Sequence, residues 1–150
     1  MATLQQTADI IVSSAGWSPV MPAENGAYRF SLEGDLDFEL LSPENRTAIL
    51  YADLGPAPSR SSDGEEQLRR LSSLAAGALK SRRTVFSIAG YRLELHLTFT
   101  LADVTQDRIL QDVRDFLNDL AWWKKQLNSS AQKTSSNTFS FGFGGWFPGN

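Results

Sequence analysis

The clearest hydrophobic pattern in the chain is a strict alternation of apolar and polar side chains after residue 90. Its apolar positions are Tyr91, Leu93, Leu95, Leu97, Phe99 and Leu101. A period of two is typical of a strand with one buried face. A tight turn at Ala89-Gly90 would place Ile88 opposite Tyr91 and Phe86 opposite Leu93, which keeps both apolar sets on the same face. The pattern therefore predicts a β-hairpin over residues 84–101.

A long amphipathic helix is predicted to follow this hairpin. Its apolar stripe consists of Ile109, Val113, Phe116, Leu117, Leu120, Trp123 and Leu127. Asp103 is the expected N-cap, and Gln106 would complete a capping box with it. Because each helical residue turns by about 100°, Trp122 is expected to face solvent while its neighbour Trp123 joins the core.

The first part of the chain predicts one helix and three strands. The helix begins after Thr3, with Gln6 completing a capping box, and ends at Gly16. Residues 28–32 and 36–40 alternate, and a three-residue turn between them would align their apolar positions. The strand predicted over Arg46 to Leu54 is apolar on both parities, so we expect both of its faces to be covered, by the chain itself or by a partner.

Ser62 or Asp63 is predicted to cap a second amphipathic helix, which ends near Leu79. Its second half holds the small residues Ala75 to Ala78, which favour close approach of another helix; tight packing on the chain's own sheet is the alternative. The strand predicted over Thr84 to Ala89 lies at a sheet end and has an unpaired edge, which a two-fold axis would cover. We therefore predict a homodimer with the interface residues Leu71, Leu74, Ala75, Ala78, Val85 and Phe86.

The predicted element order is α-β-β-β-α-β-β-α, an α+β fold with a twisted antiparallel sheet flanked by helices. A chain of 150 residues with 41% hydrophobic content can bury one sizeable core. We expect one domain over residues 1–127. Residues 128–150 change to a Ser/Gly/aromatic composition without helical period, and we expect them to form a flexible tail.

The composition offers little catalytic chemistry. There is no cysteine for disulfides or thiol chemistry, and the single histidine, His96, has no second histidine or cysteine to complete a metal site. Carboxylates such as Asp112 and Asp115 are expected on a solvated helix face, where nothing perturbs them for acid-base work. We expect no cofactor, no metal and no enzymatic activity. The alternative is a small enzyme that uses His96 with Glu94 or Asp103.

Charge and hydropathy limit the partners and the location. The net charge of −3 and the scarcity of basic clusters argue against nucleic acid. No apolar stretch approaches the roughly 20 residues needed to span a bilayer, and the N-terminus lacks the pattern of a signal peptide. We expect a soluble cytoplasmic protein without membrane insertion.

Several segments, taken with the element order, resemble a known family. They are Ile49-Leu50-Tyr51-Ala52-Asp53-Leu54-Gly55, the helix Leu71 to Leu79, the strand Leu93-Glu94-Leu95-His96-Leu97, the lead-in Leu101-Ala102-Asp103, and Phe116 spaced seven before Trp123. Over about residues 3–127 the chain resembles the single-effector chaperones of bacterial type III secretion, the Tir-chaperone (class I) family. The aromatic tail departs from that family's usual pattern.

The resemblance implies a homodimeric bacterial chaperone that holds the N-terminal segment of one secreted effector in extended form and keeps it soluble and competent for secretion. It also implies the secretion ATPase as a further partner. Such binding needs apolar pockets and an available strand edge, for which we select residues 27–33. The predicted effector-binding residues are Ile10, Trp17, Tyr28, Phe30, Leu41 and Trp122. A same-fold adaptor that binds a secretion-apparatus or regulatory component is the alternative.

The tail suggests one more hypothesis. Phe139, Phe141 and Phe143 alternate like one face of an extended peptide. A tethered segment of this kind could occupy the apolar surface that the client uses. A tail without any docking site is the alternative.

Overall fold

The computed structural model describes residues 2–131; residue 1 and residues 132–150 lie outside this description. The elements are α1 (Leu4–Ala15), β1 (Tyr28–Phe30), β2 (Phe38–Leu41), β3 (Thr47–Pro56), α2 (Ser62–Ala78), β4 (Val85–Ala89), β5 (Arg92–Thr100) and α3 (Gln106–Ala131). This order confirms the predicted α+β fold. Helix α3 continues to Ala131, four residues beyond the expected domain boundary at 127. The rest of the predicted tail falls outside the described residues.

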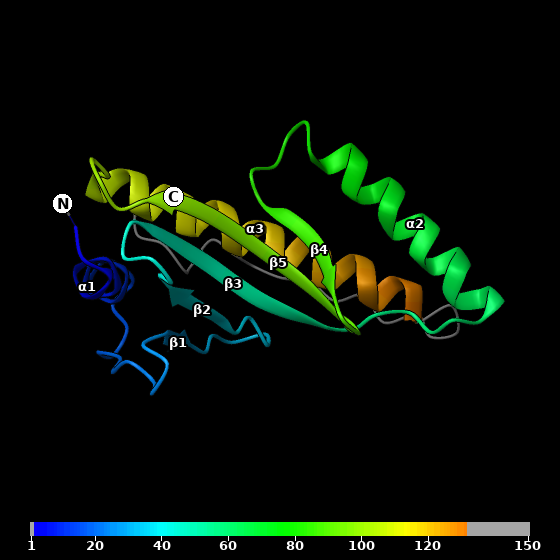
Figure 1. Cartoon of the computed structure of the whole chain (residues 1–150), viewed down its shortest axis with the longest axis horizontal. Helices are drawn as coiled ribbons and strands as arrows, with labels where there is room; N and C mark the ends of the chain where they lie inside the picture. Colours follow the sequence, from blue (N-terminus) through cyan, green and yellow to red (C-terminus); the bar gives the residue numbers. More distant parts are fainter. Residues whose placement is uncertain (1, 132–150) are drawn as a thin grey trace.

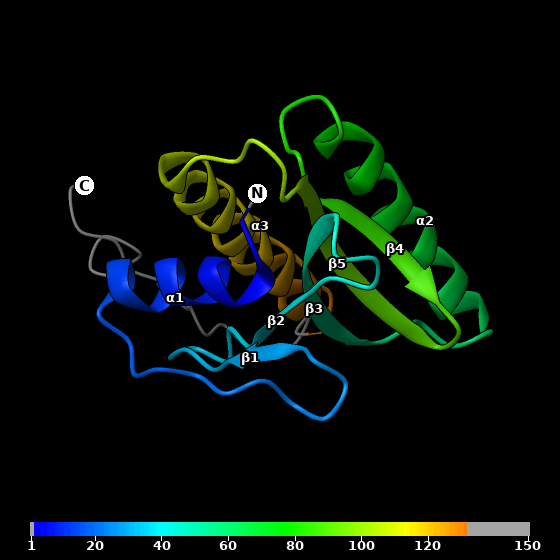
Figure 2. The ribbon, with the colours of Figure 1, turned by 60° about the vertical axis from the view of Figure 1, so that its left-hand side comes forward.

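The strands form one antiparallel sheet with the order β1-β2-β3-β5-β4. Helices α1 and α3 contact each other and pack on one face of this sheet (Figure 1). Helix α2 lies beside β4 at the end of the sheet, which a second view also shows (Figure 2). The face of the sheet that points away from α1 and α3 is therefore not covered by any element within residues 2–131.

The core lies between the sheet and α3. Six of the seven predicted stripe residues of α3 are buried, and only Leu127 is half-buried. They meet the inward-facing residues of the central strands, which include Leu50 and Leu95 at 0% exposure. Trp123 is 1% exposed, and its ring stacks on Phe86 of β4 with 4.1 Å between ring centroids. The helical and strand periods thus identified the core correctly.

The β4–β5 hairpin turns one residue later than predicted. Ala89 pairs with Arg92 and Ile88 pairs with Leu93, so the two-residue loop is Gly90-Tyr91. Gly90 has φ of +62°, which glycine adopts at the first position of a tight hairpin loop without the steric cost of a Cβ. Tyr91 is 83% exposed at the tip, and it is not a buried strand residue as predicted. The pairing is shifted by two residues relative to the prediction, and a shift by an even number keeps each side chain on its face. All side chains of the hairpin except Tyr91 therefore lie on the predicted face.

Two of the predicted helix caps are wrong. Thr105, not Asp103, caps α3, because its hydroxyl accepts the Arg108 N–H at 3.2 Å. Asp103 instead has φ of +59° in the connection that leads into the helix. Helix α2 is capped by Ser61, whose hydroxyl accepts the N–H of Gly64. Helix α1 has the predicted capping box between Thr3 and Gln6 and ends at Gly16 with φ of +71°.

The connection between α2 and β4 is anchored on α3 by ion pairs. Arg82 pairs with Asp119 and Arg83 pairs with Asp112. The hydroxyl of Thr84 also donates to Asp119, at 2.7 Å. Asp112 is 0% exposed, so the expected solvated position of this carboxylate is wrong. Its charge is compensated by Arg83 from the α2–β4 connection and by Arg108 one turn earlier on α3. This anchoring fixes where α2 and β4 emerge from the domain.

Helix α2 itself packs lightly on the rest of the described chain. Leu71 is its one buried apolar side chain, at 2% exposure. Gly64 is buried where the preceding loop closes on the helix, and a Cβ at this position would lie 1.7 Å from the carbonyl oxygen of Ser59. Leu74 and Ala75 are half-buried against the core, and Ala78 and Leu79 are left available for other contacts.

Candidate functional site

Two strands of the sheet have an edge without a neighbouring strand in the described part of the chain. Strand β1 pairs with β2 alone, which agrees with the predicted edge at residues 27–33, and β4 pairs with β5 alone. An open edge presents a row of main-chain N–H and C=O groups that an extended peptide can pair with. The two edges lie at opposite ends of the sheet.

The six predicted effector-binding residues do not form one site. Tyr28 and Phe30 lie in the core at 7% and 3% exposure, because their side chains point toward the helices. Ile10, Trp17 and Trp122 are half-buried and pack against the core, so part of each side chain is already used inside the protomer. Leu41 is half-buried away from these residues, next to Ile49 of β3.

The structure brings the N-terminal aromatic residues together beside β1. Trp17 lies 6.0 Å from Phe30 and 6.4 Å from Phe38 between ring centroids, and the two phenylalanines stack at 4.8 Å. Figure 2 shows α1 next to β1 and β2. We call Ile10, Trp17 and Val20, all half-buried, together with the open β1 edge the α1–β1 surface. Sequence analysis missed Phe38 as the residue that supports Trp17, although its alternation with Leu36 and Leu40 marked it as core.

A second apolar surface lies on the open face of the sheet. Leu41 and Ile49 pair across β2 and β3 and form a hollow of about 340 Å³ with Tyr51, which is rimmed by Glu39 and His96. Leu41 and Ile49 are half-buried, yet neither packs against the core. The expectation that β3 is covered on both faces therefore holds for one face within residues 2–131, and no element of these residues covers the other. We call these five residues the open-face hollow.

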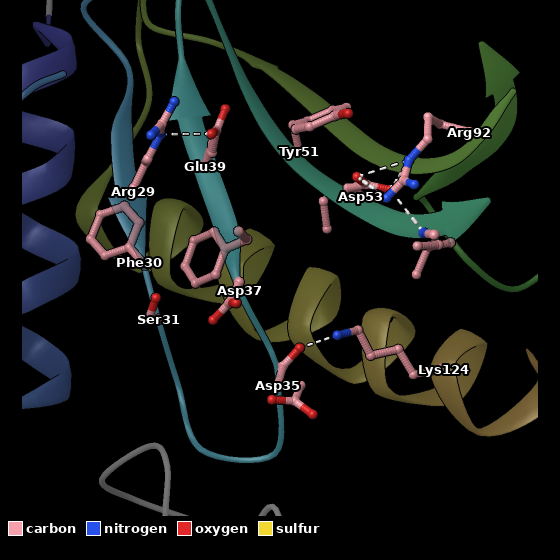
Figure 3. A pocket seen from close by; sticks show the side chains of 14 residues that line it. Arg29, Phe30, Ser31, Asp35, Asp37, Glu39, Tyr51, Asp53, Arg92 and Lys124 are labelled. Atoms are coloured by element: carbon pink, nitrogen blue, oxygen red, sulfur yellow. Dashed lines mark hydrogen bonds and ion pairs between the residues drawn. The ribbon is translucent and has the colours of Figure 1, made fainter. Parts of the chain in front are cut away.

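The open-face hollow continues into a notch at the end of β2. Strand β2 pairs with β3 no further than Tyr51, whereas β5 follows β3 to Pro56. The notch has a volume of about 610 Å³ and shares Glu39 and Tyr51 with the hollow (Figure 3). Its charged walls hold the pairs Arg29–Glu39 at 2.9 Å and Arg92–Asp53 at 2.6 Å, and Lys124 of α3 donates to the carbonyl of Asp35.

Electrostatics at the notch follows from these pairs. The hydrogen bond from Arg92 lowers the pKa of Asp53 below its ordinary 3.8. Burial raises the pKa of Tyr51 to about 12, and the hydrogen bond that Tyr51 donates to Glu94 at 3.0 Å adds to this effect. Asp53 therefore stays charged and Tyr51 stays neutral across the neutral pH range.

The residues of the enzymatic alternative are not assembled into a dyad. Glu94 accepts the hydrogen bond of Tyr51, and Asp103 lies beyond the end of β5, in the connection to α3. His96 lies opposite Tyr51 on the open face. No group of three or more His, Asp or Glu side chains within residues 2–131 is placed to hold a metal ion.

The pKa of Asp53 provides a direct test of this geometry. Its stabilising contribution is present above 3.8 and is lost as the pH falls through the lowered pKa. The side chain is 44% exposed, so solvent screening keeps the contribution small. In a carboxyl carbon NMR titration, Arg92→Gln should raise the pKa of Asp53, while Arg60→Gln in the exposed loop before α2 should not. An unchanged titration in Arg92→Gln would contradict this cause.

The predicted dimer residues divide into two groups. Leu71 and Phe86 are already used inside the protomer, Leu71 in the core and Phe86 against Trp123. Leu74, Ala75 and Ala78 are half-buried on α2, and Val85 is 42% exposed on β4. Leu79 at 66% and Ile88 at 45% exposure lie on the same elements and were not selected, although Leu79 belongs to the apolar stripe of the helix.

Comparison with known proteins supports the fold. No protein-family model and no curated protein matches the sequence. Among solved structures, a chain of the ExsC–ExsE complex matches with a TM-score of 0.62 and 16% identity over 85% of this chain and 97% of that chain. A chain of the HopA1–SchA chaperone–effector complex matches with a TM-score of 0.61 and 11% identity over 79% and 91%.

A third match comes from the Yersinia pestis type III secretion chaperone SycH in complex with a stable fragment of YscM2. Its TM-score is 0.57 and its identity 9%, over 80% of this chain and 98% of that chain. In none of the described helices is there a stretch long and apolar enough to cross a membrane. The chain therefore has the α+β fold of type III secretion chaperones, as its sequence pattern indicated.

Proposed function

We propose that the protein is a bacterial cytoplasmic chaperone that binds the N-terminal segment of a type III secreted effector in extended form and keeps it soluble and competent for secretion. The observation that carries this proposal is the α1–β1 surface, an open strand edge flanked by half-buried apolar side chains. The fold is shared with chains of a chaperone–effector complex and of a secretion chaperone complex.

The physical argument is that an edge and pockets suit an unfolded client. Main-chain pairing along β1 satisfies the backbone of any sequence, so it supplies affinity with little selectivity. Alternate side chains of the client then select apolar contacts such as Ile10 and Trp17. No cofactor or nucleotide is needed for this kind of binding, because the free energy comes from burial and hydrogen bonds.

We also propose that the protein is a homodimer whose seam is formed by α2 and β4. Leu74 and Ala75 pack against the core of the protomer, whereas Ala78 is half-buried and Leu79 exposed, so the C-terminal part of the stripe has apolar surface left for a second copy. Strand β4 adds an open edge with Val85 and Ile88 exposed. A two-fold axis at this end would bury both features symmetrically and leave both α1–β1 surfaces accessible.

Substitution on the α1–β1 surface tests the chaperone role. Once the effector is known, Ile10→Asp should weaken binding of its N-terminal segment by about tenfold, roughly 1.4 kcal/mol, because a carboxylate would be buried against apolar client side chains. Leu110→Asp, at another half-buried aliphatic side chain that belongs to neither named surface, should change the affinity by less than twofold. Titration calorimetry measures both, and equal weakening would argue against this surface.

Co-purification from the native cytoplasm, followed by mass spectrometry, identifies the partner. Recovery of one secreted protein through its N-terminal segment would support the proposal. Recovery of a secretion-apparatus component, a regulatory protein or the secretion ATPase without an effector would replace it with an adaptor function on the same fold.

A further inference from the structure

We propose that the chain's own segment Phe139 to Phe143 docks in the open-face hollow and covers the outer face of β3. This assigns an occupant to a surface that no element within residues 2–131 covers. The inference concerns contacts inside one chain, so it stands apart from the proposed function and does not need an effector.

The hollow is built for an apolar occupant. Leu41 and Ile49 form its floor and Tyr51 one wall, and none of the three belongs to the buried core. Two polar groups beside these residues are already satisfied, because Arg92 pairs with Asp53 and Glu94 accepts from Tyr51. The exposed Val85, opposite His96, extends the apolar surface toward β4. An apolar hollow beside satisfied polar groups favours aromatic or aliphatic side chains over a charged partner.

The spacing of the aromatic residues fits the strand beneath them. Phe139, Phe141 and Phe143 are separated by one residue each, which in an extended chain puts their rings on one side at intervals of about 7 Å. Ile49 and Tyr51 point outward from β3 with the same interval. Two successive rings can therefore contact Ile49 and Tyr51 at once, while Ser140 and Gly142 face away.

The chain is long enough to reach the hollow. Lys124 of α3 lines the notch, and the notch shares Tyr51 and Glu39 with the hollow. The seven residues from Lys124 to Ala131 add about 10 Å of helix. The eight residues from Ala131 to Phe139 can span up to about 27 Å when extended, which exceeds the roughly 10 Å back to Lys124 at the notch and leaves length to continue toward the open face.

Tethering compensates for a weak contact. A short tether gives a segment an effective concentration on the order of mM, so a contact with mM affinity would occupy the hollow about half of the time. The three rings would shield Leu41 and Ile49 from water when no other ligand is present.

The methyl group of Ile49 provides the test in the full chain. In methyl NMR spectra, docked phenylalanine rings should move the Ile49 signal upfield. A variant with Phe139, Phe141 and Phe143 all changed to Ser should lose that shift. The control variant Ser135→Ala, Ser136→Ala, Ser140→Ala should keep it, and the Ile88 methyl on β4 should not respond in any variant. A synthetic peptide of residues 136–149 added to the triple Phe→Ser protein should restore the Ile49 shift.

Three results would overturn the proposal. The first is an Ile49 signal that is the same with and without the three phenylalanines. The second is a shift that the peptide cannot restore, and the third is a shift that appears only at high protein concentration, which would assign the hollow to a second copy. Because no client takes part in this experiment, its outcome is independent of whether the effector-binding proposal survives.

Discussion

Replacing Trp123 by alanine should lower the free energy of unfolding by about 3–5 kcal/mol, the largest effect we expect from a single substitution. The side chain is 1% exposed in the middle of α3. It joins the helix to β4 through its stacked contact with Phe86, so its loss leaves a cavity between two elements that are far apart in sequence. Chemical denaturation followed by circular dichroism measures this loss.

Trp122→Ala is the matched control, because it removes the same side chain one position earlier. Sequence analysis predicted a solvent-exposed Trp122, but the structure makes it half-buried, with the Arg82 guanidinium 4.4 Å above its ring and Trp123 against its edge. We expect a loss of about 1 kcal/mol, mainly from the cation–π contact and partial burial. Equal destabilisation by the two substitutions would mean that α3 is rotated relative to this structure.

Replacing Ala78 by arginine should convert the proposed dimer into a monomer. Ala78 lies on the small-residue stripe of α2, where a long charged side chain would separate the two copies and bury its charge without a partner. Multi-angle light scattering reports the mass directly. The protomer itself should remain folded, since Leu71, Leu74 and Ala75 anchor α2 on the core.

Ala76→Arg controls for the added charge and length. Ala76 is exposed and lies two positions away, about 200° around the same helix, so the dimer should persist in this variant. A dimer that survives Ala78→Arg would exclude this seam. Dissociation by both substitutions would indicate that the contact surface surrounds more of the helix than the apolar stripe.

The sequence alone determined the elements and most of the core. Side-chain periods of two and 3.6 are local properties, so the alternation in β5 and the stripe of α3 identified which side chains are buried. The order of elements followed, and with it the sheet edges at β1 and β4. The capping box at Thr3 and the stop at Gly16 were equally local, since each depends on residues within one turn of the helix.

Tertiary structure alone decided features that depend on distant partners. The pattern of its own helix predicts a solvated Asp112. In the structure this side chain is buried, where it accepts a hydrogen bond from Arg83, 29 residues earlier in the sequence. Thr105 caps helix α3, because Asp103 has a positive φ in the turn that follows β5 and the helix begins only after this turn. The hairpin loop is Gly90-Tyr91 because its first position has a positive φ, which glycine adopts without steric cost. The alternation of apolar residues contains no information about this preference.

The candidate binding residues show the same division. Apolar composition marked Tyr28, Phe30 and Leu41 alike, but the sheet assigns the first two to the core and the third to the opposite face. Which face of β3 remains open depends on where α1 and α3 pack, and a one-dimensional pattern that is apolar on both parities contains no such information. The sequence therefore determined which segments are apolar, and the packing of helices on one side of the sheet decided which of them are available to a partner.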